Sequence, residues 1–249
     1  MDDPHANLTV SRNKGRESTA YLTYIIDNYH NLPEYVIFLH ALRYQWHNED
    51  PMYDGVPPIR NLRLSYVEQH GYANMRCTWS LGCPAELHPY TDPSKIEEAL
   101  AGNNDRDKTE AAFTRAYLEL FPDAKAEEAP TAVGIPCGAQ FALSRWMIQS
   151  RPLDDYKRIR NWLWATELPD AVSGRILEYS WHVLMGKPFE YCPSAKECFC
   201  DKFGLCDLEC RQVGSCEKRY KLPQYATIPN NWPKEGAGKN GFPEWGWWE

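Results

Sequence analysis

The chain has 249 residues, of which 43% are apolar and 24% are charged. This composition is typical of globular proteins and excludes a largely disordered chain, and the length suffices for one large domain or two small ones. The net charge of -7 and the pI near 5.6 argue against a protein that binds nucleic acid through a broad basic surface. The sequence shows neither a run of about 18 apolar residues nor a secretory signal, so it predicts a cytoplasmic protein without a membrane span.

The first 40 residues alternate between strand-like and helix-like patterns. Residues 8–10 resemble a strand that begins abruptly, so we expect an upstream strand or anchor. Apolar residues follow helical spacing within residues 16–29, and residues 35–40 form a short apolar, β-branched run. Strand, helix and strand in this order indicate a parallel β/α unit.

The patterns further along the chain predict more helices and two more strands. Residues 92–130 are polar and charged, and we interpret them as an insertion. These elements together predict an α/β fold with a mostly parallel sheet flanked by helices. We expect strands within residues 72–89 and 138–145, and helices at residues 57–71, 109–121, 154–165 and 172–185.

Six of the nine cysteines crowd into residues 192–216. We therefore predict an α/β catalytic domain over residues 1–190 and a Cys-rich, aromatic extension over residues 191–249 that packs on it. In an oxidising compartment this density is typical of disulfides, whereas in the cytosol it favours zinc bound by thiolates. The spacing matches no standard pair of C-x2-C motifs, so structural zinc, disulfides and free thiols all stay open.

The apolar run at residues 35–40 leads directly into a cluster of polar side chains. Ligands collect at the carboxyl ends of strands in open α/β sheets, so this cluster lies where a site is expected. His40 and His47 are candidate acid/base groups. Arg43 is a candidate anion clamp, and Trp46 is a candidate stacking wall. The alternative is a solvated loop with one or two structural histidines.

Candidate chemistry also occurs outside this cluster. Lys14 and Arg16 flank a predicted helix N-terminus that could bind an anion, although a capping turn explains the same residues. Cys83 is a candidate nucleophile, with inert packing as the alternative. Ser144 is another, but it lacks the G-x-S-x-G motif of serine hydrolases.

Several acidic residues allow more than one interpretation. Glu86 can pair with a cationic substrate group or lie on the surface. Glu178 and His182 are four residues apart on a predicted helix, where they form an acid/base pair, half a metal site or a helix-stabilising pair. The D-x-D motif at residues 105–107 has no strand before it, so we predict no catalytic metal site.

Four blocks of the sequence resemble a fungal family defined only as a domain of unknown function. They are "NKGRESTAYLTYIIDNYHNLPEYVIFLHALRYQWHNEDPMYDG", "GYANMRCTWSLGCPAE", "CGAQFALSR" and "VSGRILEYSWHVLMGKPFEYCPSAKECFCDKFGLC". The resemblance implies an α/β fold distantly similar to GT-A-type (Rossmann-like) glycosyltransferases. It also implies kinship with the fungal arginine-containing cyclodipeptide synthases. Those enzymes join arginine to a second amino acid from aminoacyl-tRNAs and close a diketopiperazine.

The resemblance to cyclodipeptide synthases implies roles for most of these residues. Aminolysis of an aminoacyl ester needs a base and a donor to the developing oxyanion. The bases would be His40 and His47, the donor Arg43 or Gln45, and the nucleophile of a covalent route Ser144 or Cys83.

The remaining predicted residues would bind the two parts of the substrate. A guanidinium is bound bidentately by carboxylates, here those of Glu17, Glu86 or Glu178. The other substrate-binding residues are Arg16, Trp46, Gln140 and His182. A confined basic surface would bind aminoacyl-tRNA through Arg145, Arg151, Lys157, Arg158 and Arg160.

The cyclodipeptide synthase reaction requires no cofactor. Two other classes of function stay open. A GT-A-like glycosyltransferase would use a nucleotide sugar, and the poorly placed D-x-D motif argues against it. A non-catalytic α/β binding protein is the third possibility. The sequence identifies neither the second amino acid nor the oligomeric state.

Overall fold

The structure is a computed structural model that describes residues 8–50 and 53–217. It divides into two units, and each is formed by separate parts of the chain. The division falls within strands β1 (Tyr35–Phe38) and β3 (Phe141–Ser144). The first unit contains residues 8–36, 84–135 and 143–191, and the second contains residues 37–50, 53–83, 136–142 and 192–217.

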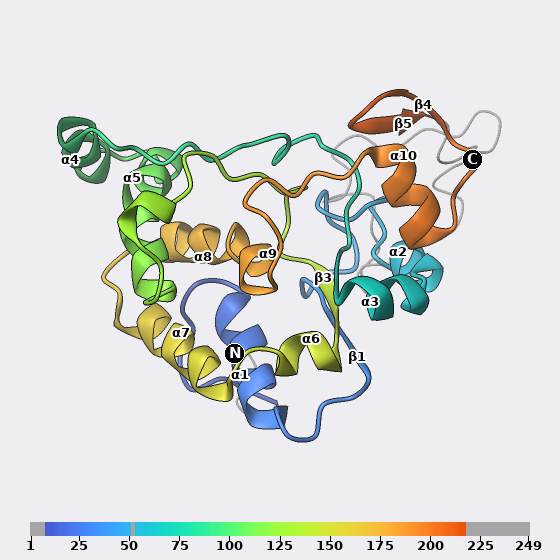
Figure 1. Cartoon of the computed structure of the whole chain (residues 1–249), viewed down its shortest axis with the longest axis horizontal. Coiled ribbons are helices and arrows are strands. Elements are labelled where there is room, and N and C mark those ends of the chain that lie inside the picture. Colours follow the sequence, from blue (N-terminus) through green and yellow to red (C-terminus); the bar gives the residue numbers. More distant parts are fainter. Residues whose placement is uncertain (1–7, 51–52, 218–249) are drawn as a thin grey trace. The chain divides into compact units, whose positions relative to one another are not determined.

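The first unit consists mainly of helices that pack around α5 (Asp105–Leu120) and α1 (Ser18–Asn28) (Figure 1). Helix α5 contacts α4, α7 and α8, and α1 contacts α7 and α8. The apolar sides of these helices are buried, with Leu22, Ile159 and Ile176 each 0% exposed. The other helices of this unit are α4 (Pro93–Ala101), η1 (Ala126–Glu128), α6 (Arg145–Gln149), α7 (Leu153–Ala165), α8 (Asp170–Glu178) and α9 (Trp181–Leu184).

Polar side chains determine where two of these helices begin. The side-chain oxygen of Asn104 accepts hydrogen bonds from the backbone N–H groups of Arg106 and Asp107 at the start of α5. Asp92 accepts one from the N–H of Ser94 at the start of α4. Each bond satisfies an amide that has no partner within its helix. Residues 92–130, predicted as an insertion, therefore supply two well-capped helices.

The second unit has short elements joined by long loops. Strands β1, β3 and β2 (Tyr72–Asn74) form a three-stranded sheet in that order. The ring of Phe141 on β3 lies 5.3 Å from that of Phe38 and 5.5 Å from that of Tyr72. These rings form the centre of the sheet's apolar packing. The remaining elements are α2 (Val56–Asn61), α3 (Leu64–His70), α10 (Ala195–Glu197), η2 (Cys198–Lys202) and the antiparallel pair β4 (Glu209–Gln212) and β5 (Ser215–Glu217).

Four disulfides cross-link the second unit. Two of them join distant parts of the chain, Cys77 to Cys198 and Cys83 to Cys192. The other two close short loops, Cys200–Cys206 and Cys210–Cys216. Of the alternatives left open for the Cys-rich segment, the structure therefore supports disulfides.

Several predicted elements are confirmed, and others are corrected. The helices at residues 16–29 and 154–165 and the strands at residues 35–40, 72–89 and 138–145 are present. Residues 8–10 form no strand, so the predicted first β/α unit is wrong in its first member. A mixed α/β fold is confirmed, but the described residues contain only small sheets and no mostly parallel, Rossmann-like one.

Two predicted helices are each divided in two. Residues 57–71 hold α2 and α3, separated by the extended residues Leu62 and Arg63. Residues 172–185 hold α8 and α9, which are separated at Tyr179 and Ser180. The apolar pattern continues through both breaks, which is why the sequence predicted one helix each time. The boundary predicted at residue 190 stays a prediction, and the aromatic end of the chain lies outside the described residues.

Candidate functional site

Two imidazole rings and an indole ring pack together in the second unit. The ring of His47 stacks on that of Trp46, with ring centroids 3.8 Å apart, and the ring of His40 meets His47 edge-on at 4.8 Å. The guanidinium carbon of Arg76 lies 5.5 Å from the centroid of the Trp46 ring. Trp46 is 41% exposed, so this side of the group is open to solvent. We call His40, Trp46 and His47 the imidazole cluster.

Two buried amide side chains hold the loop that carries the imidazole cluster. Gln140 accepts a hydrogen bond from the N–H of His40 and donates one to the side-chain oxygen of Asn48, both at 3.1 Å. Asn48 in turn donates to the carbonyl oxygens of Arg43 at 2.6 Å and Tyr53 at 2.7 Å. Buried amides with these bonds rigidify a loop, because each lost bond would leave a buried polar group unpaired. Gln140, predicted to bind substrate, therefore positions the cluster.

The predicted anion clamp is part of an internal ion pair. Arg43 donates to both carboxylate oxygens of Asp54, at 2.9 Å from Nε and 2.7 Å from Nη2. This hydrogen bonding raises the pKa of Arg43 further above its usual range. The guanidinium fork is thus already occupied by a carboxylate. Gln45, the other predicted oxyanion donor, lies in the same loop and is held by a bond from its backbone N–H to Tyr53.

Glu17 and Glu178, which we call the carboxylate pair, interact electrostatically in the first unit. Glu17 is the N-cap residue of α1, and Glu178 is the last residue of α8. Burial, together with the negative charge of Glu178 and against the opposing effect of Arg16, raises the pKa of Glu17 to about 7. The pKa of Tyr21 is also raised by burial and by both carboxylates. A site with these properties attracts a cation, which would restore the ionised form of Glu17.

The loop before α1 is fixed to the start of α8. The N–H of Gly15 donates to the carboxylate of Asp170 at 3.1 Å, and the ammonium of Lys14 donates to the carbonyl of Leu168 at 2.6 Å. The amide predicted to bind an external anion is therefore paired with an internal carboxylate. Arg16 has a φ of 56°, an uncommon conformation for a residue other than glycine, and its side chain runs beside Gly174.

The predicted pair of Glu178 and His182 is wrong in its geometry. The two residues lie on either side of the break between α8 and α9, so they do not share one helix face. The Nε2 atom of His182 lies 3.0 Å from the carbonyl oxygen of Phe189. Burial lowers the pKa of His182 to about 4, so the imidazole is neutral near pH 7. This histidine joins two segments of the first unit.

Three other predicted residues also make structural interactions. Cys83 is bonded to Cys192, so it has no thiol with which to act as a nucleophile. The hydroxyl of Ser144 caps α6 by accepting a bond from the N–H of Met147 at 3.3 Å. Glu86 accepts a hydrogen bond from the hydroxyl of Tyr179 and lies near the guanidinium of Arg106.

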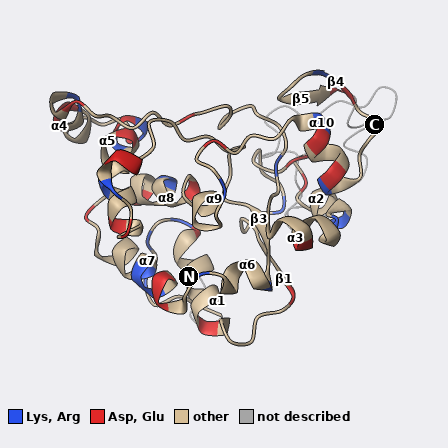
Figure 2. Ribbon diagram, viewed as in Figure 1, with Lys and Arg blue, Asp and Glu red and all other residues tan. Residues whose placement is uncertain are grey.

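Three of the five predicted tRNA-binding residues pair with acidic residues of α7, a helix on which Figure 2 shows both basic and acidic positions. Lys157 pairs with Asp154 at 2.9 Å, and both Arg151 and Arg158 pair with Asp155. Arg160 lies over the ring of Trp164, and Arg145 donates to the carbonyl of Pro33. Ion pairing thus offsets the charge of three of the five residues, and the tRNA-binding surface stays a prediction.

Two residues that the sequence did not indicate are central to the second unit. Glu49 accepts bonds at 2.8 Å from the N–H groups of Cys77 and Thr78. Lys202 is only 2% exposed, and its ammonium lies 2.6 Å from the carbonyl oxygen of Asn74 and 3.1 Å from the sulfur of Cys198. Burial lowers the pKa of Lys202 to about 7. A lysine in a polar, Cys-rich segment carries no pattern that predicts complete burial.

Within residues 8–50 and 53–217, no three or more His, Cys, Asp or Glu side chains are arranged to hold a metal ion. In the same ranges, no helix is long and apolar enough to cross a membrane.

A mixed α/β fold with a disulfide-linked second unit is thus the class that the structure defines. Residues 1–201 match a family described as "Protein of unknown function (DUF3431)", and the chain belongs to this family. No curated protein and no solved structure matches the chain.

Proposed function

We propose that the chain is an aminoacyl transferase that makes an arginine-containing cyclic dipeptide from two aminoacyl-tRNAs. The amine of one aminoacyl group attacks the ester carbonyl of the other and releases one tRNA. The second amine then attacks the remaining ester, closes the diketopiperazine ring and releases the second tRNA. No cofactor takes part in either step. This proposal places the protein in the cytoplasm, where aminoacyl-tRNAs occur.

The carboxylate pair of Glu17 and Glu178 is the observation that supports this proposal. A guanidinium is planar and binds carboxylates through two parallel hydrogen bonds. Glu17 is half protonated near pH 7 because burial and Glu178 both disfavour its charge. An arginyl guanidinium bound beside Glu17 would favour the ionised form of its carboxylate, so Glu17 would release its proton on binding.

Variants of the pair test guanidinium binding directly. We expect Glu17→Gln and Glu178→Gln to lower product formation about 100-fold, because one charge-assisted hydrogen bond contributes roughly 1.5–3 kcal/mol. The product is measured by mass spectrometry of the medium of a microbial host. Glu110→Gln is the control, since Glu110 is a carboxylate of the same unit that is 7% exposed and already bonds Arg106 and the N–H of His88.

Calorimetry with arginine amide separates binding from turnover. The wild-type protein should bind this probe and release a proton near pH 7, seen as a dependence of the heat on the buffer. Glu17→Gln should bind it more weakly and release no proton. If folded wild-type protein makes no arginine-containing diketopiperazine, the proposed reaction is wrong; if both glutamine variants stay fully active, the carboxylate pair is not the site.

The imidazole cluster of the second unit is an independent candidate for the general bases, and it is tested separately from the carboxylate pair. We expect His40→Asn or His47→Asn to remove turnover while arginine amide still binds. Thermal unfolding controls for stability, because His47 stacks on Trp46 in the wild-type protein. Two fully active variants would assign a structural role to the cluster.

A GT-A-like glycosyltransferase is the second candidate, and the four disulfides favour it. Disulfides persist in the secretory lumen and outside the cell and are rare in the cytosol, where aminoacyl-tRNAs occur. Asp105 and Asp107 lie in the first turn of α5, which is no support for a metal-binding D-x-D motif. Metal-dependent hydrolysis of a nucleotide sugar, together with full protection of eight cysteines from alkylation in intact cells, would favour this candidate over the first.

A further inference from the structure

A buried lysine lies against one of the long-range disulfides of the second unit. The ammonium of Lys202 donates to the carbonyl oxygen of Asn74 at 2.6 Å and lies 3.1 Å from the sulfur of Cys198, which is bonded to Cys77. Cys198 and Lys202 are the first and last residues of η2, about one helical turn apart, so their side chains lie on the same side of it. Lys202, Cys77 and Cys198 are all buried, so water does not separate the ammonium from the sulfur.

The surroundings of Lys202 compensate its positive charge only in part. The ammonium lies 5.9 Å from the ring centroid of Tyr66 and 5.7 Å from that of Phe203, and these aromatic faces attract a cation weakly. Burial lowers the pKa of Lys202 to about 7, although the negative charge of Glu49 acts in the opposite direction. The sulfur atoms of a disulfide are neutral, so the nearest atoms to the ammonium offer no balancing charge.

Reduction of the disulfide by a dithiol would supply that charge. A thiolate of the dithiol attacks the sulfur of Cys77, the S–S bond breaks and Cys198 leaves as a thiolate. The second sulfur of the dithiol then displaces Cys77, and the dithiol becomes a disulfide. Of its two protons, one goes to the sulfur of Cys77 and the other to the amine of Lys202. An ammonium beside a thiolate stabilises it, and a stabilised reduced form makes a disulfide easier to reduce.

The same disulfide is connected to the loop that carries the imidazole cluster. The N–H groups of Cys77 and Thr78 both donate to Glu49 at 2.8 Å, and the hydroxyl of Thr78 donates to the other oxygen of Glu49 at 2.8 Å. Glu49 follows Asn48, whose side chain holds that loop. Two thiols cannot stay at bonding distance, so reduction moves Cys77 away from Cys198 and shifts the segment that Glu49 binds.

We propose that the Cys77–Cys198 disulfide is a redox switch of the imidazole cluster, in which Lys202 stabilises the reduced form by pairing with the thiolate of Cys198. The reductant is a dithiol. Because both cysteines are buried, exchange requires local opening of the second unit, which affects the rate of reduction and not its equilibrium. The inference goes beyond the proposed transferase and does not rest on it, because it concerns the arrangement of the cluster, whatever reaction the cluster takes part in.

A redox titration tests the role of Lys202. The folded protein is equilibrated with mixtures of reduced and oxidised dithiothreitol and alkylated, and peptide mass spectrometry then reports each disulfide separately. We expect Lys202→Met to lower the equilibrium constant for reduction of Cys77–Cys198 at least tenfold, which corresponds to about 30 mV for two electrons. An equilibrium constant equal to that of wild type would overturn the proposal.

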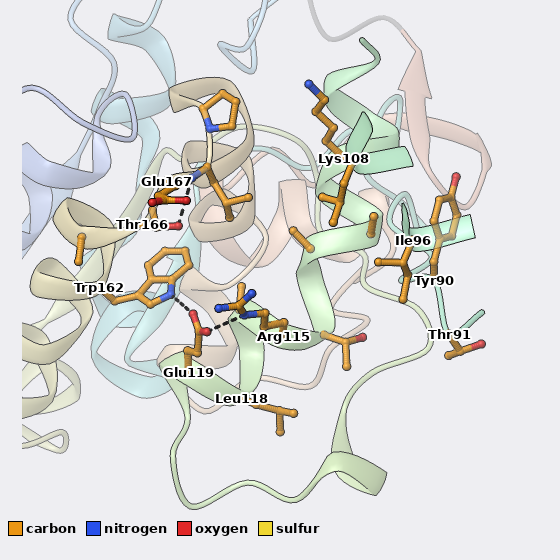
Figure 3. A pocket seen from close by; sticks show the side chains of 18 residues that line it. Tyr90, Thr91, Ile96, Lys108, Arg115, Leu118, Glu119, Trp162, Thr166 and Glu167 are labelled. Atoms are coloured by element: carbon orange, nitrogen blue, oxygen red, sulfur yellow. Dashed lines mark hydrogen bonds and ion pairs between the residues drawn. The ribbon is translucent and has the colours of Figure 1, made fainter. Parts of the chain in front are cut away.

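The chain offers two controls for this titration. Cys83–Cys192 joins residues 109 apart, close to the 121 of Cys77–Cys198, and its equilibrium constant should be the same in wild type and Lys202→Met. Lys108→Met is the matched variant, because Lys108 is a half-buried lysine at a groove of about 1310 Å³ in the first unit (Figure 3). All four disulfides of the described residues lie in the second unit, so this variant should titrate like wild type.

Nuclear magnetic resonance of the histidine rings tests the connection to the imidazole cluster. In wild-type protein we expect the signals of His40 and His47 to change with the same midpoint as the reduction of Cys77–Cys198. The signal of His182, in the first unit, is the control and should stay unchanged at that midpoint. Unchanged signals of His40 and His47 in protein with this disulfide reduced would overturn the switch.

Wild-type protein by itself carries the test if Lys202→Met does not fold. Loops of nearly equal length contribute nearly equal chain entropy, so the two long-range disulfides are comparable in this respect. We expect Cys77–Cys198 to be reduced at a lower ratio of reduced to oxidised dithiothreitol than Cys83–Cys192. Reduction of both at the same ratio, or in the reverse order, would overturn the proposal.

Discussion

The two units of this protein are stabilised in different ways. In the first, long helices satisfy their own backbone hydrogen bonds and bury apolar sides against α5 and α1. In the second, short elements leave much of the chain in loops, and all four disulfides of the described residues lie there. Loops lose conformational entropy on folding with few contacts in return, so cross-links that constrain the unfolded chain compensate for them.

Removing a long-range disulfide should have the largest effect. Cys77 and Cys198 are 121 residues apart, so their bond stabilises the folded state by about 5 kcal/mol in the chain-entropy treatment. We expect the double variant Cys77→Ser with Cys198→Ser to have a free energy of unfolding in urea that is about 5 kcal/mol lower than that of wild type. Cys200→Ser with Cys206→Ser is the control, because a separation of 6 residues corresponds to about 2 kcal/mol. Equal losses for the two pairs would contradict the comparison.

Lys202 should make the stability of the second unit depend on alkaline pH. Its pKa is lowered to about 7 by burial, so the unfolded chain binds a proton between about pH 7 and 10.5 that the folded chain releases. Stability is therefore full above pH 10.5 and falls as the pH drops towards 7, by on the order of 4 kcal/mol. The measurement is the difference in unfolding free energy between wild type and Lys202→Met across this range. A difference that is constant with pH would show that Lys202 titrates normally.

Gly134 of the first unit should be highly sensitive to an added carbon atom. A Cβ at Gly134 would lie 1.9 Å from the carbonyl oxygen of Pro84, and a backbone atom cannot move aside. We expect Gly134→Ala to lower the free energy of unfolding by about 3 kcal/mol, as substitutions at overpacked sites do, and thermal unfolding measures it. Gly186→Ala is the matched control: Gly186 has a φ of 70° but nothing within 4 Å of an added Cβ, so only about 1 kcal/mol of backbone strain is expected.

Glu17 should give the first unit a smaller pH dependence, in an acidic window. Its pKa is raised from 4.5 to about 7, so the folded chain holds a proton that the unfolded chain releases. Stability is full below about pH 4.5 and is lost as the pH rises through 7, by on the order of 2 kcal/mol after allowance for solvent screening. Glu17→Gln should be more stable than wild type at pH 7 and equal to it at pH 4.

The difference in stability between wild type and Glu17→Gln isolates the effect of Glu17 from that of His182. The pKa of His182 is lowered to about 4, so its contribution is present above pH 6.5 and is lost as the pH falls towards 4. Both proteins contain His182, and its effect cancels in the difference. A Glu17→Gln variant that is less stable than wild type at pH 7 would contradict the raised pKa.

Periodicity predicted the elements whose packing is regular along the chain. The apolar spacing of residues 16–29 and 154–165 matches α1 and α7, and the apolar run from Tyr35 matches β1. The breaks at Leu62 and Tyr179 were missed, because the apolar pattern continues through both. The predicted parallel sheet was an inference from element order, and order does not determine which strands pair.

Of the candidate sites, too, one was predictable from the sequence and others only from the tertiary structure. The sequence by itself located the imidazole cluster, because His40, Trp46 and His47 are close along the chain and one loop brings their rings together. Only the tertiary structure decided that the charge of Glu178 acts on Glu17 and that Cys83 is bonded to Cys192. Local patterns report which face of an element is apolar, whereas contacts between distant residues depend on the path of the whole chain. The chemistry of isolated side chains was therefore predictable, and their partners were not.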